Sequence, residues 1–367
     1  MKLLITGGAG FIGSNLVDYF LAKDFEVVCL DNLATGFEEN IKHHFDNPNF
    51  TFINGDIRDL ETCKKAIKGC DYVTHQAALG SVPRSIKDPM TTNSVNIDGF
   101  LNMLIATRDE GIKRFVYAAS SSTYGDSKKL PKVEEEIGRP LSPYAITKYI
   151  NELYADVFAK TYGMQCIGLR YFNVFGKRQT TEGAYAAVIP LWIKKLINLE
   201  QPIINGDGSY SRDFTYIENV MHANELALMK DTNEIFFGQR KYYNLEFDDH
   251  KYLQQINKKV DELLHNFKIE NDYYFSEVFN IAYGGNISLL QLCDALTTSL
   301  SIFDKNIKQI KPIFGELRVG DVPHSQASIL KARTILDYRP KIDVYNGLEL
   351  SVDWYYNNLG ETLINKH

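Results

Sequence analysis

A tyrosine and a lysine four residues apart form the most informative pair in the sequence. Tyr144 and Lys148 lie in the segment SPYAITK, where Ser142 and Pro143 favour the start of a helix. Residues at this spacing share one face of a helix, so the phenol and the ammonium group would be neighbours. A nearby cation lowers the pKa of a phenol and prepares it to act as a base. Alone, the YxxxK spacing is common and usually marks two solvated side chains.

A run of three serines supplies a third group for this chemistry. Ser120, Ser121 and Ser122 follow a predicted strand upstream of the tyrosine. Open parallel sheets bind ligands at the carboxyl ends of their strands, so Ser120 is expected beside a substrate. The three groups together predict an oxidoreductase site. In it Tyr144 accepts a hydroxyl proton, Lys148 stabilises the phenolate and Ser120 orients the same oxygen.

A glycine-rich turn joins the first predicted strand to a helix. The segment GGAGFIG at 7–13 permits a tight turn, close approach of the backbone to a pyrophosphate, and close helix packing. Asp31 ends the second strand, where a carboxylate binds ribose hydroxyls and repels a 2′-phosphate, so the predicted cofactor is NAD rather than NADP. Asp31 is otherwise a turn residue with Asn32. Asp56 would contact the adenine or cap the next helix.

Short β-branched segments alternate with helical patterns through the first half of the chain. The predicted strands are 3–6, 26–30, 50–54, 72–75, 114–118 and 165–170. This alternation predicts an α/β fold, a Rossmann-type doubly wound parallel sheet with a smaller mixed C-terminal substrate domain. The expected domains are an NAD-binding domain at 1–172 and a substrate-binding domain at 173–367. Segments near 213–231 and 276–284 are expected to return to the first domain, and 232–275 is predicted to be an insertion with one helix, 250–267.

Composition narrows the class of partner. The 367 residues carry a formal net charge of −6, with lysine and arginine scattered along the chain. This pattern predicts no nucleic-acid or membrane partner and favours a small molecule. Five cysteines without CxxC or Cys/His spacing favour reduced thiols, no metal site and a cytoplasmic protein. Glycines interrupt the first apolar run before a signal peptide forms, and no stretch is apolar enough to span a bilayer.

These motifs together resemble the extended short-chain dehydrogenases, and within them the UDP-N-acetylglucosamine 4-epimerases of bacterial surface-polysaccharide pathways. The resemblance covers nearly the whole chain. It is carried by GGAGFIG at 7–13, DNLATG at 31–36, HQAALGSVPRS at 75–85, ASSSTYGD at 119–126, SPYAITK at 142–148, RYFNVFGKRQ at 170–179, GAYAAVIP at 183–190, NGDGSYSRDFTYIENV at 205–220 and RVGDVPHS at 318–325. So many ordered matches are specific, although each alone is not.

The resemblance implies two sets of binding residues. The NAD site would be lined by Gly7, Gly10, Phe11, Ile12, Gly13, Asp31, Asn32, Thr35, Gly36, Asp56, Ile57, Gln76, Ala77, Tyr144, Lys148 and Tyr171. The substrate side would be formed by Gly80, Ser81, Arg84, Ser120, Ser121, Ser122, Asn173, Ala187, Val188, Trp192, Asn205, Arg212, Arg318, Asp321 and Ser325. Arg212 and Arg318 suit a UDP diphosphate, because a planar guanidinium pairs bidentately with phosphate oxygens. Trp192 would lie near the uracil or belong to the core.

The reaction implied by the resemblance is 4-epimerisation of a UDP-N-acetylhexosamine through transient oxidation at carbon 4 by tightly bound NAD. At the position of Ser325, the similar epimerases that are limited to non-acetylated sugars carry a bulky aromatic residue. A serine there would leave room for the N-acetyl group. The helices near 98–110 and 144–162 resemble those that join two subunits in a four-helix bundle, so a homodimer is expected.

Three alternatives stay open. A 4-epimerase of a UDP-N-acetylhexosaminuronic acid would use the same groups. A sugar-nucleotide 4,6-dehydratase is disfavoured, because the Asp-Glu pair of that family corresponds here to Ser121 and Ser122. A non-catalytic NAD-binding protein is disfavoured by the complete serine, tyrosine and lysine set. The chain departs from the family pattern at Ile203, where relatives tend to carry a tyrosine, and in the long insertion.

Overall fold

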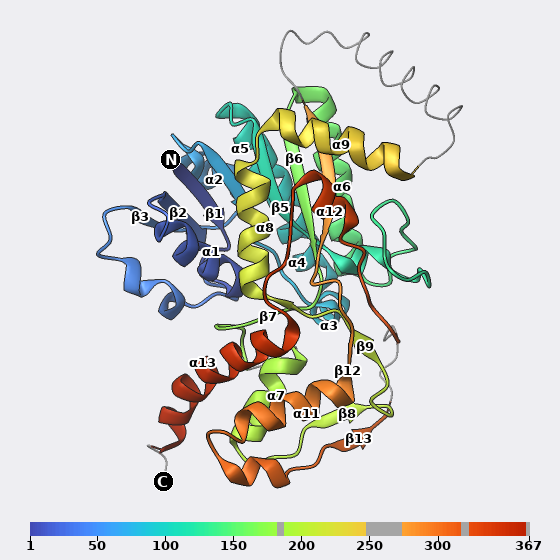
Figure 1. Ribbon diagram of the computed structural model, residues 1–367. Helices are drawn as coiled ribbons and strands as arrows, with labels where there is room; N and C mark the ends of the chain where they lie inside the picture. The colour runs from blue at the N-terminus through green and yellow to red at the C-terminus, as the bar shows by residue number, and fades with distance from the viewer. Residues whose placement is uncertain (182–186, 247–273, 317–322, 365–367) are drawn as a thin grey trace.

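A seven-stranded parallel sheet forms the centre of the computed structural model, which describes residues 1–181, 187–246, 274–316 and 323–364 (Figure 1). Its strands are β1 (Lys2–Thr6), β2 (Glu26–Asp31), β3 (Phe50–Asn54), β4 (Tyr72–His75), β5 (Arg114–Ser120), β6 (Gln165–Tyr171) and β11 (Phe275–Ile281). They lie in the order β11-β6-β5-β4-β1-β2-β3. The predicted Rossmann-type sheet is confirmed, and β5 and β6 extend beyond their predicted ends to include Ser120 and Tyr171.

Helices cover both faces of this sheet. In β1, Leu3 and Ile5 face one apolar cluster and Leu4 faces the other, as expected for a strand buried on both sides. The helices α1 (Phe11–Leu21) and α8 (Ile217–Met229) pack on the first face. The helices α2 (Leu60–Ile67), α5 (Gly99–Asp109) and α6 (Pro143–Tyr162) pack on the second. The strand order reverses between β1 and β4, which is where such sheets bind ligands.

A helical segment links β4 to α5 and supports the edge of the sheet. It consists of α3 (Val82–Lys87), α4 (Pro89–Asn93) and a π-helical turn at Ser94–Asp98. Within that turn, Asn96 accepts a hydrogen bond from the Leu79 amide at 2.8 Å and donates to Thr147 Oγ1 at 3.1 Å. The turn therefore ties the loop after β4 to α6.

The C-terminal part is smaller and mixed, and it lies below the sheet in Figure 1. Its elements are β7 (Val174–Phe175), α7 (Val188–Ile197), β8 (Ile203–Asn205), β9 (Ser211–Arg212), β10 (Thr215–Tyr216), β12 (Ile287–Ser288), α11 (Leu289–Leu300), β13 (Ile313–Gly315) and α13 (Val344–Ile364). The strands pair as β10 with β7, β12 with β9 and β13 with β8. Three later elements, α8, β11 and α12 (Leu330–Ile335), lie with the main sheet, where α12 contacts β11. The domain boundary after residue 172 stays a prediction.

The insertion begins with a helix that the sequence interpretation missed, α9 (Thr232–Glu246). Ile235 and Tyr242 are buried on one side of it. Gly238 packs so closely on α12 that a Cβ there would lie 2.6 Å from Ile335 Cα. The polar composition of this segment hid the helix, which is stabilised by tertiary contacts rather than by a strong apolar repeat. The predicted helix at 250–267 lies outside the described residues.

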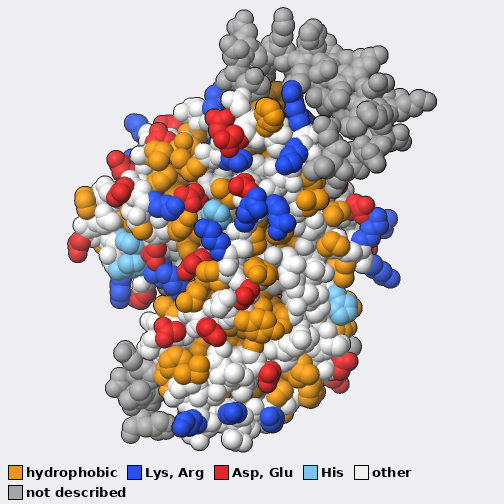
Figure 2. Space-filling model, viewed as in Figure 1, with side chains coloured by type: hydrophobic (Ala, Val, Ile, Leu, Met, Phe, Trp, Pro, Cys, Tyr) orange, Lys and Arg blue, Asp and Glu red, His pale blue; other side chains and the backbone are white. Residues whose placement is uncertain are grey.

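The surface carries charges of both signs. Over most of the face shown in Figure 2, basic and acidic side chains are interspersed. Among the described residues, no helix is both long and apolar enough to cross a membrane.

Candidate active site

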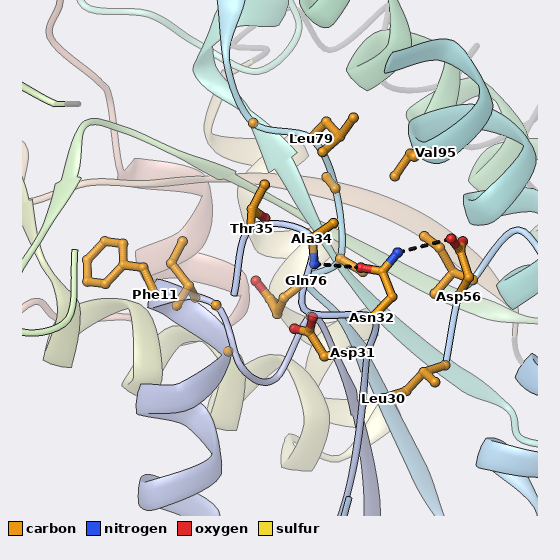
Figure 3. A pocket seen from close by; sticks show the side chains of 18 of the residues that line it. Phe11, Leu30, Asp31, Asn32, Ala34, Thr35, Asp56, Gln76, Leu79 and Val95 are labelled. Carbon is orange, nitrogen blue, oxygen red and sulfur yellow. Dashed lines mark hydrogen bonds between the residues drawn. The ribbon is translucent and has the colours of Figure 1, made fainter. Parts of the chain in front are cut away.

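A cavity of about 380 Å³ lies where the carboxyl ends of β1, β2, β3 and β4 meet (Figure 3). Most of the residues predicted to contact NAD line it, namely Gly7, Gly10, Phe11, Ile12, Gly13, Asp31, Asn32, Thr35, Asp56, Ile57, Gln76 and Ala77. Gly80, Ser81 and Arg84, predicted for the substrate, line the same cavity. Gly36 packs against this wall, since a Cβ there would lie 2.7 Å from the Ala9 carbonyl carbon. The volume is in the range of small-molecule sites.

The glycine-rich turn fits a dinucleotide. Gly7 has a left-handed φ of 67°, and a Cβ on it would lie 2.7 Å from the Ala77 amide nitrogen. At Gly13 a Cβ would lie 2.0 Å from the Gly7 carbonyl oxygen. The helix α1 begins at Phe11, and its first turn has no side-chain cap. Backbone can therefore approach a pyrophosphate at the positive end of α1.

Asp31 is a turn residue, as one of the two interpretations of the sequence predicted, and its predicted contact with a ribose stays a prediction. Its Oδ2 accepts a hydrogen bond from the Ala9 amide at 2.9 Å, and its Oδ1 accepts one from the Leu33 amide at 2.8 Å. Burial raises the pKa of Asp31, while these backbone hydrogen bonds lower it. The carboxylate thus shapes the turn after β2 and also lines the cavity.

Asp56 and Asn32 are hydrogen-bonded to each other in the wall of the cavity. Asn32 Nδ2 donates to Asp56 Oδ2 at 3.0 Å, and Arg58 Nη2 lies 2.6 Å from the same oxygen. The hydrogen bonds from Arg58 lower the pKa of Asp56 to about 2, so the group is ionised. The alternative role of Asp56 as a helix cap is wrong, because Asp59 caps α2 through the amides of Glu61 and Thr62.

Gln76 and Tyr171 meet in a buried hydrogen-bonded group between β4 and β6. The Tyr171 hydroxyl donates to Gln76 Oε1 at 3.1 Å and accepts from Asn224 Nδ2 at 2.9 Å. Gln76 Nε2 also donates to Thr74 Oγ1 at 2.8 Å. These contacts hold the Gln76 side chain at the cavity wall. Asn224, on α8, was not foreseen from the sequence.

The three predicted catalytic residues lie together at the end of β5. Ser120 is the last residue of that strand, and its Oγ lies 2.9 Å from Ser122 Oγ in the helical turn at Ser121–Tyr124. Tyr144 and Lys148 lie in the first turns of α6, which Ser142 caps. The side chains of Tyr144 and Ser120 are hydrogen-bonded. None of the three is among the residues that line the cavity, but β5 pairs with β4, and Gln76 and Ala77 directly after β4 form part of the cavity wall.

Burial is the largest influence on the pKa values of both Lys148 and Tyr144, and it leaves the pKa of the Tyr144 phenol above its ordinary value. Burial lowers the pKa of Lys148 to about 8, against the attraction of Glu152. Lys148 Nζ donates to the Ala118 carbonyl at 2.7 Å, which fixes its position. Burial raises the pKa of the Tyr144 phenol, and the hydrogen bond with Ser120 lowers it. Below pH 8 the ammonium group is mostly charged and favours the phenolate.

Two predicted substrate residues, Arg212 and Ser325, come together from distant parts of the chain. Arg212 Nη1 donates to the carbonyls of Ser211 at 2.9 Å and Pro323 at 3.0 Å. The Ser325 amide donates to the Ser211 carbonyl at 3.1 Å. Two further predictions, Arg318 and Asp321, lie outside the described residues.

Trp192 lies in the core, which is one of the two places predicted for it from the sequence. Its side chain is 2% exposed and its Nε1 donates to the Ile203 carbonyl at 3.2 Å. Asn205 ends β8 and lies beside Gly315 of β13. A ring stacked on uracil is therefore not supplied by Trp192.

The remaining residues predicted to bind the substrate lie at the ends of helices and strands. Asn173 adopts a positive φ of 36° after β6, and its Nδ2 donates to the Asp213 carbonyl at 2.9 Å. Ala187 precedes α7 as its N-cap, and Val188 is the first residue of that helix. Ser81 caps α3.

Several residues of the cavity wall were missed. They are Leu30, Ala34, Gly55, Ala78, Leu79, Val95 and Thr180. Ala34, Ala78 and Leu79 lie inside quoted motifs, and Leu30 and Gly55 directly precede predicted contacts, so proximity to a motif would have found them. Val95 and Thr180 carry no such signal, because only the folded chain brings them to the cavity.

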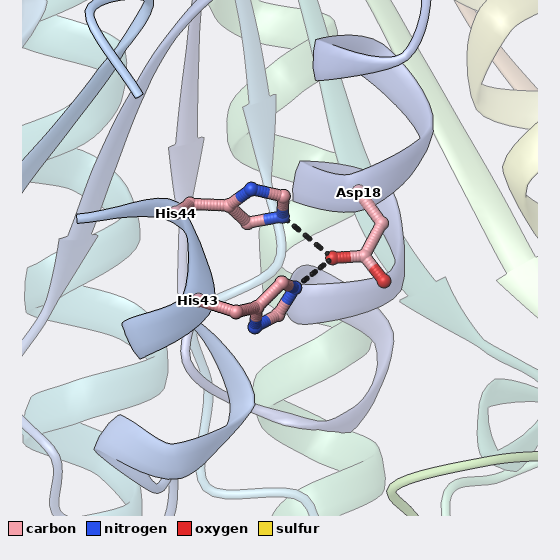
Figure 4. A group of neighbouring side chains, drawn as sticks. All are labelled: Asp18, His43 and His44. Atoms are coloured by element: carbon pink, nitrogen blue, oxygen red, sulfur yellow. Dashed lines mark hydrogen bonds and ion pairs between the residues drawn. The ribbon is translucent and has the colours of Figure 1, made fainter. Parts of the chain in front are cut away.

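Asp18, His43 and His44 form a cluster away from this cavity (Figure 4). The Nε2 atoms of His43 and His44 lie 3.0 and 2.8 Å from Asp18 Oδ1, while Arg178 and Lys177 approach Oδ2 at 2.8 and 3.5 Å. Burial raises the pKa of Asp18, but these partners outweigh it and the pKa lies below its ordinary value. Two cations beside the carboxylate oppose a bound metal ion. The cluster anchors the segment after β2 to α1.

Comparison with known proteins places these features in one family. The sequence model of the NAD dependent epimerase/dehydratase family matches residues 3–237. The chain is similar to the solved structure of a UDP-N-acetylglucosamine 4-epimerase from Methanobrevibacter ruminantium M1 in complex with UDP-N-acetylmuramic acid, with 33% identity, a TM-score of 0.79, and coverage of 97% of this chain and 98% of that one. It is similar to a UDP-glucose 4-epimerase from Thermotoga maritima with UDP-glucose, with 32% identity, a TM-score of 0.79, and coverage of 98% and 100%. A UDP-glucose 4-epimerase from Mycolicibacterium smegmatis is 29% identical over 359 residues, 97% of this chain and 99% of the relative.

Proposed function

Because the chain belongs to the NAD dependent epimerase/dehydratase family, we propose that it is an NAD-dependent UDP-sugar 4-epimerase whose substrate is a UDP-N-acetylhexosamine. The observation that carries the proposal is the grouping of Ser120, Tyr144 and Lys148 at the end of β5, beside a cavity whose glycines fit a dinucleotide. A phenol flanked by a hydroxyl and an ammonium group suits the removal and return of a sugar hydroxyl proton.

Residues of this chain would remove the proton of the sugar hydroxyl and return it. Bound NAD supplies the reversible hydride acceptor for carbon 4. Tyr144 takes the proton of the 4-hydroxyl and returns it after the 4-keto sugar has presented its opposite face. Ser120 would hydrogen-bond the same oxygen, and the Lys148 ammonium group, one helical turn from Tyr144, would offset negative charge on the phenol.

The assay that tests the function is NMR of the purified protein with UDP-N-acetylglucosamine, and separately with its uronic acid, without added NAD. Formation of the galacto epimer of the neutral sugar would support the proposal. Conversion of the acid alone would keep the mechanism and change the substrate. A 4-keto-6-deoxy product, or no turnover with either sugar, would contradict the proposal.

Small residues at the predicted substrate positions support the acetylated substrate. Ser325 lies beside Ser211, with a side chain far smaller than an aromatic ring. Gly80 has open space where a Cβ would stand. Together with Ser81 and Ala187 these residues would leave room for the N-acetyl group.

The Ser325→Tyr variant should therefore discriminate against the acetylated sugar. The ring would fill the space of the N-acetyl group, so we expect kcat/KM for UDP-N-acetylglucosamine to fall at least about tenfold relative to that for UDP-glucose. Ser325→Ala is the control and should keep the wild-type ratio. An unchanged ratio in Ser325→Tyr would mean that this position does not select the substrate. Steady-state kinetics with both sugars measures the ratio.

We also propose a homodimer formed through α6. Ile146, Leu153 and Val157 follow a helical spacing and are 48%, 49% and 53% exposed, so they form an apolar stripe on the outer side of α6. Leu153→Arg should shift the protein to the monomer in light scattering, whereas Ile302→Arg, at an apolar residue 80% exposed elsewhere, should not. A monomeric wild type would refute the dimer.

The cysteines bear on the compartment. All five are free and buried. Such thiols suit a reducing environment, so we place the enzyme in the cytoplasm, supplying a sugar nucleotide for polysaccharide synthesis.

A further inference from the structure

A buried ion pair lies one helical turn beyond the catalytic lysine. Glu152 follows Lys148 by four residues on α6, so their side chains share one face of the helix. Arg170 of β6 binds the Glu152 carboxylate through two hydrogen bonds, in which Nε donates to Oε1 at 2.9 Å and Nη2 donates to Oε2 at 2.8 Å. The two side chains are only 7% and 4% exposed. The pair is buried, and its carboxylate member lies on the face of α6 that carries Lys148, one turn along the helix.

Further contacts hold Arg170 in one position. Its Nη1 donates to the Glu134 carbonyl at 3.0 Å, and its guanidinium carbon lies 4.9 Å from the centroid of the Tyr124 ring. In the sheet, Arg170 is the register partner of Ala119 on β5. A bidentate pair whose arginine is held by further contacts permits little movement of either side chain. The Glu152 carboxylate is therefore fixed relative to α6.

Charged and titratable groups approach Lys148 from three elements. On α6, Tyr144 precedes it and Glu152 follows it. On β4, His75 is buried, and burial together with Lys148 lowers its pKa to about 3, so the ring is neutral. On β5, the Ala118 carbonyl accepts the Lys148 hydrogen bond. Among the described residues, the charge that raises the pKa of Lys148 against burial is that of Glu152.

We propose that Glu152, held by Arg170, is a positioning residue that keeps Lys148 in its cationic form for the reaction at Tyr144. The inference rests on the proposed 4-epimerase function, since it assigns a role within that site. Burial alone disfavours an ammonium ion, because a charge is costly where water is excluded. A fixed carboxylate one turn away offsets part of this cost. Arg170 is required because an unpaired carboxylate at the same depth would itself be costly.

The Glu152→Gln variant tests the proposal because it keeps the shape of the side chain and removes its charge. The NAD-loaded protein is labelled with ¹⁵N at lysine Nζ and titrated by NMR, and the Lys148 signal is identified by its loss in Lys148→Met. We expect the pKa of Lys148, about 8 in the wild type, to fall by about one unit or more. The alkaline limb of kcat against pH should move down by the same amount, with little change in KM.

A matched control separates this effect from lost stability. Glu277 is a comparably buried carboxylate, 8% exposed, that pairs with Lys331 at 2.9 Å. Glu277→Gln should lower the melting temperature without moving the Lys148 titration. If Glu152→Gln does not fold, the Glu152→Gln/Arg170→Gln double variant removes both charges and leaves no uncompensated cation. It should give a smaller fall in the pKa of Lys148, because the repulsion from Arg170 is removed together with the attraction of Glu152.

The outcomes distinguish this inference from the proposed function. An unchanged Lys148 titration in Glu152→Gln, or in the double variant, would overturn the role of Glu152. An equal fall in Glu277→Gln would overturn it too, because the effect would then be a general loss of structure. If the wild type shows no 4-epimerase activity while the Lys148 titration still shifts, the proposed function fails and the electrostatic coupling stands.

Discussion

Tyr144→Phe should lower the 4-epimerisation rate by at least about 100-fold, because the variant has no phenol to accept and return the proton. The ring itself remains, so the protein should fold and keep NAD bound. The substrate oxygen would also lose its proposed hydrogen bond with the phenol and keep only the one with Ser120. NMR of product formation measures the rate, and the absorbance of nicotinamide released on denaturation measures the cofactor.

The control for this variant is Tyr149→Phe, on the same helix. Tyr149 directly follows Lys148 and so points to a different side of α6, away from Ser120. Its loss should leave the rate close to that of the wild type. If Tyr144→Phe retains most of the activity, another group accepts the proton and the mechanism proposed for Tyr144 is wrong. If NAD is lost as well, the low rate reports on cofactor binding instead.

Gly13→Ala should produce a protein that is purified without NAD. A Cβ at Gly13 would lie 2.0 Å from the Gly7 carbonyl oxygen, a distance that neither backbone segment can accept without moving. The turn would have to open, which costs about 1–3 kcal/mol in overpacking and displaces the amides that face the pyrophosphate. We expect a lower melting temperature and at least about tenfold weaker NAD binding, measured by thermal unfolding and calorimetry.

Gly10→Ala provides the graded comparison for that variant. A Cβ at Gly10 would lie 3.2 Å from the same Gly7 oxygen, so a small adjustment suffices. The loss of NAD should be smaller than in Gly13→Ala. Equal losses in both variants would show that the turn tolerates no side chain at either position. Full NAD retention in Gly13→Ala would contradict the fit of the turn to a dinucleotide.

The elements of the sheet could be predicted because their signals are local. The strand 50–54 was located at its observed bounds from β-branched residues alone, and Ser142 with Pro143 marked the start of α6. The glycines of the first turn were found because a tight turn and a close helix contact require residues without side chains. These features depend on neighbours in the sequence, so the sequence shows them.

Other features depend on contacts that the sequence does not display. The helix α9 was missed because Gly238 and Tyr242 are stabilised by packing on α12 and its surroundings. Asp56 was a candidate cap for α2, but the chain geometry gives that place to Asp59. Both outcomes reflect the position of a second segment in space, which local propensity does not encode.

By itself the sequence determined the sheet, the glycine turn and the spacing of Tyr144 and Lys148, because strand and helix periodicity and steric limits on turns act over a few residues. Only the tertiary structure decided that Asn224 and Tyr171 support Gln76, and that Arg170 binds the Glu152 carboxylate on the face of α6 that carries Lys148. Burial and charge pairing arise when distant strands and helices pack. The residue types of the site can therefore be predicted from the sequence, whereas their burial and charge pairing become known only from the fold.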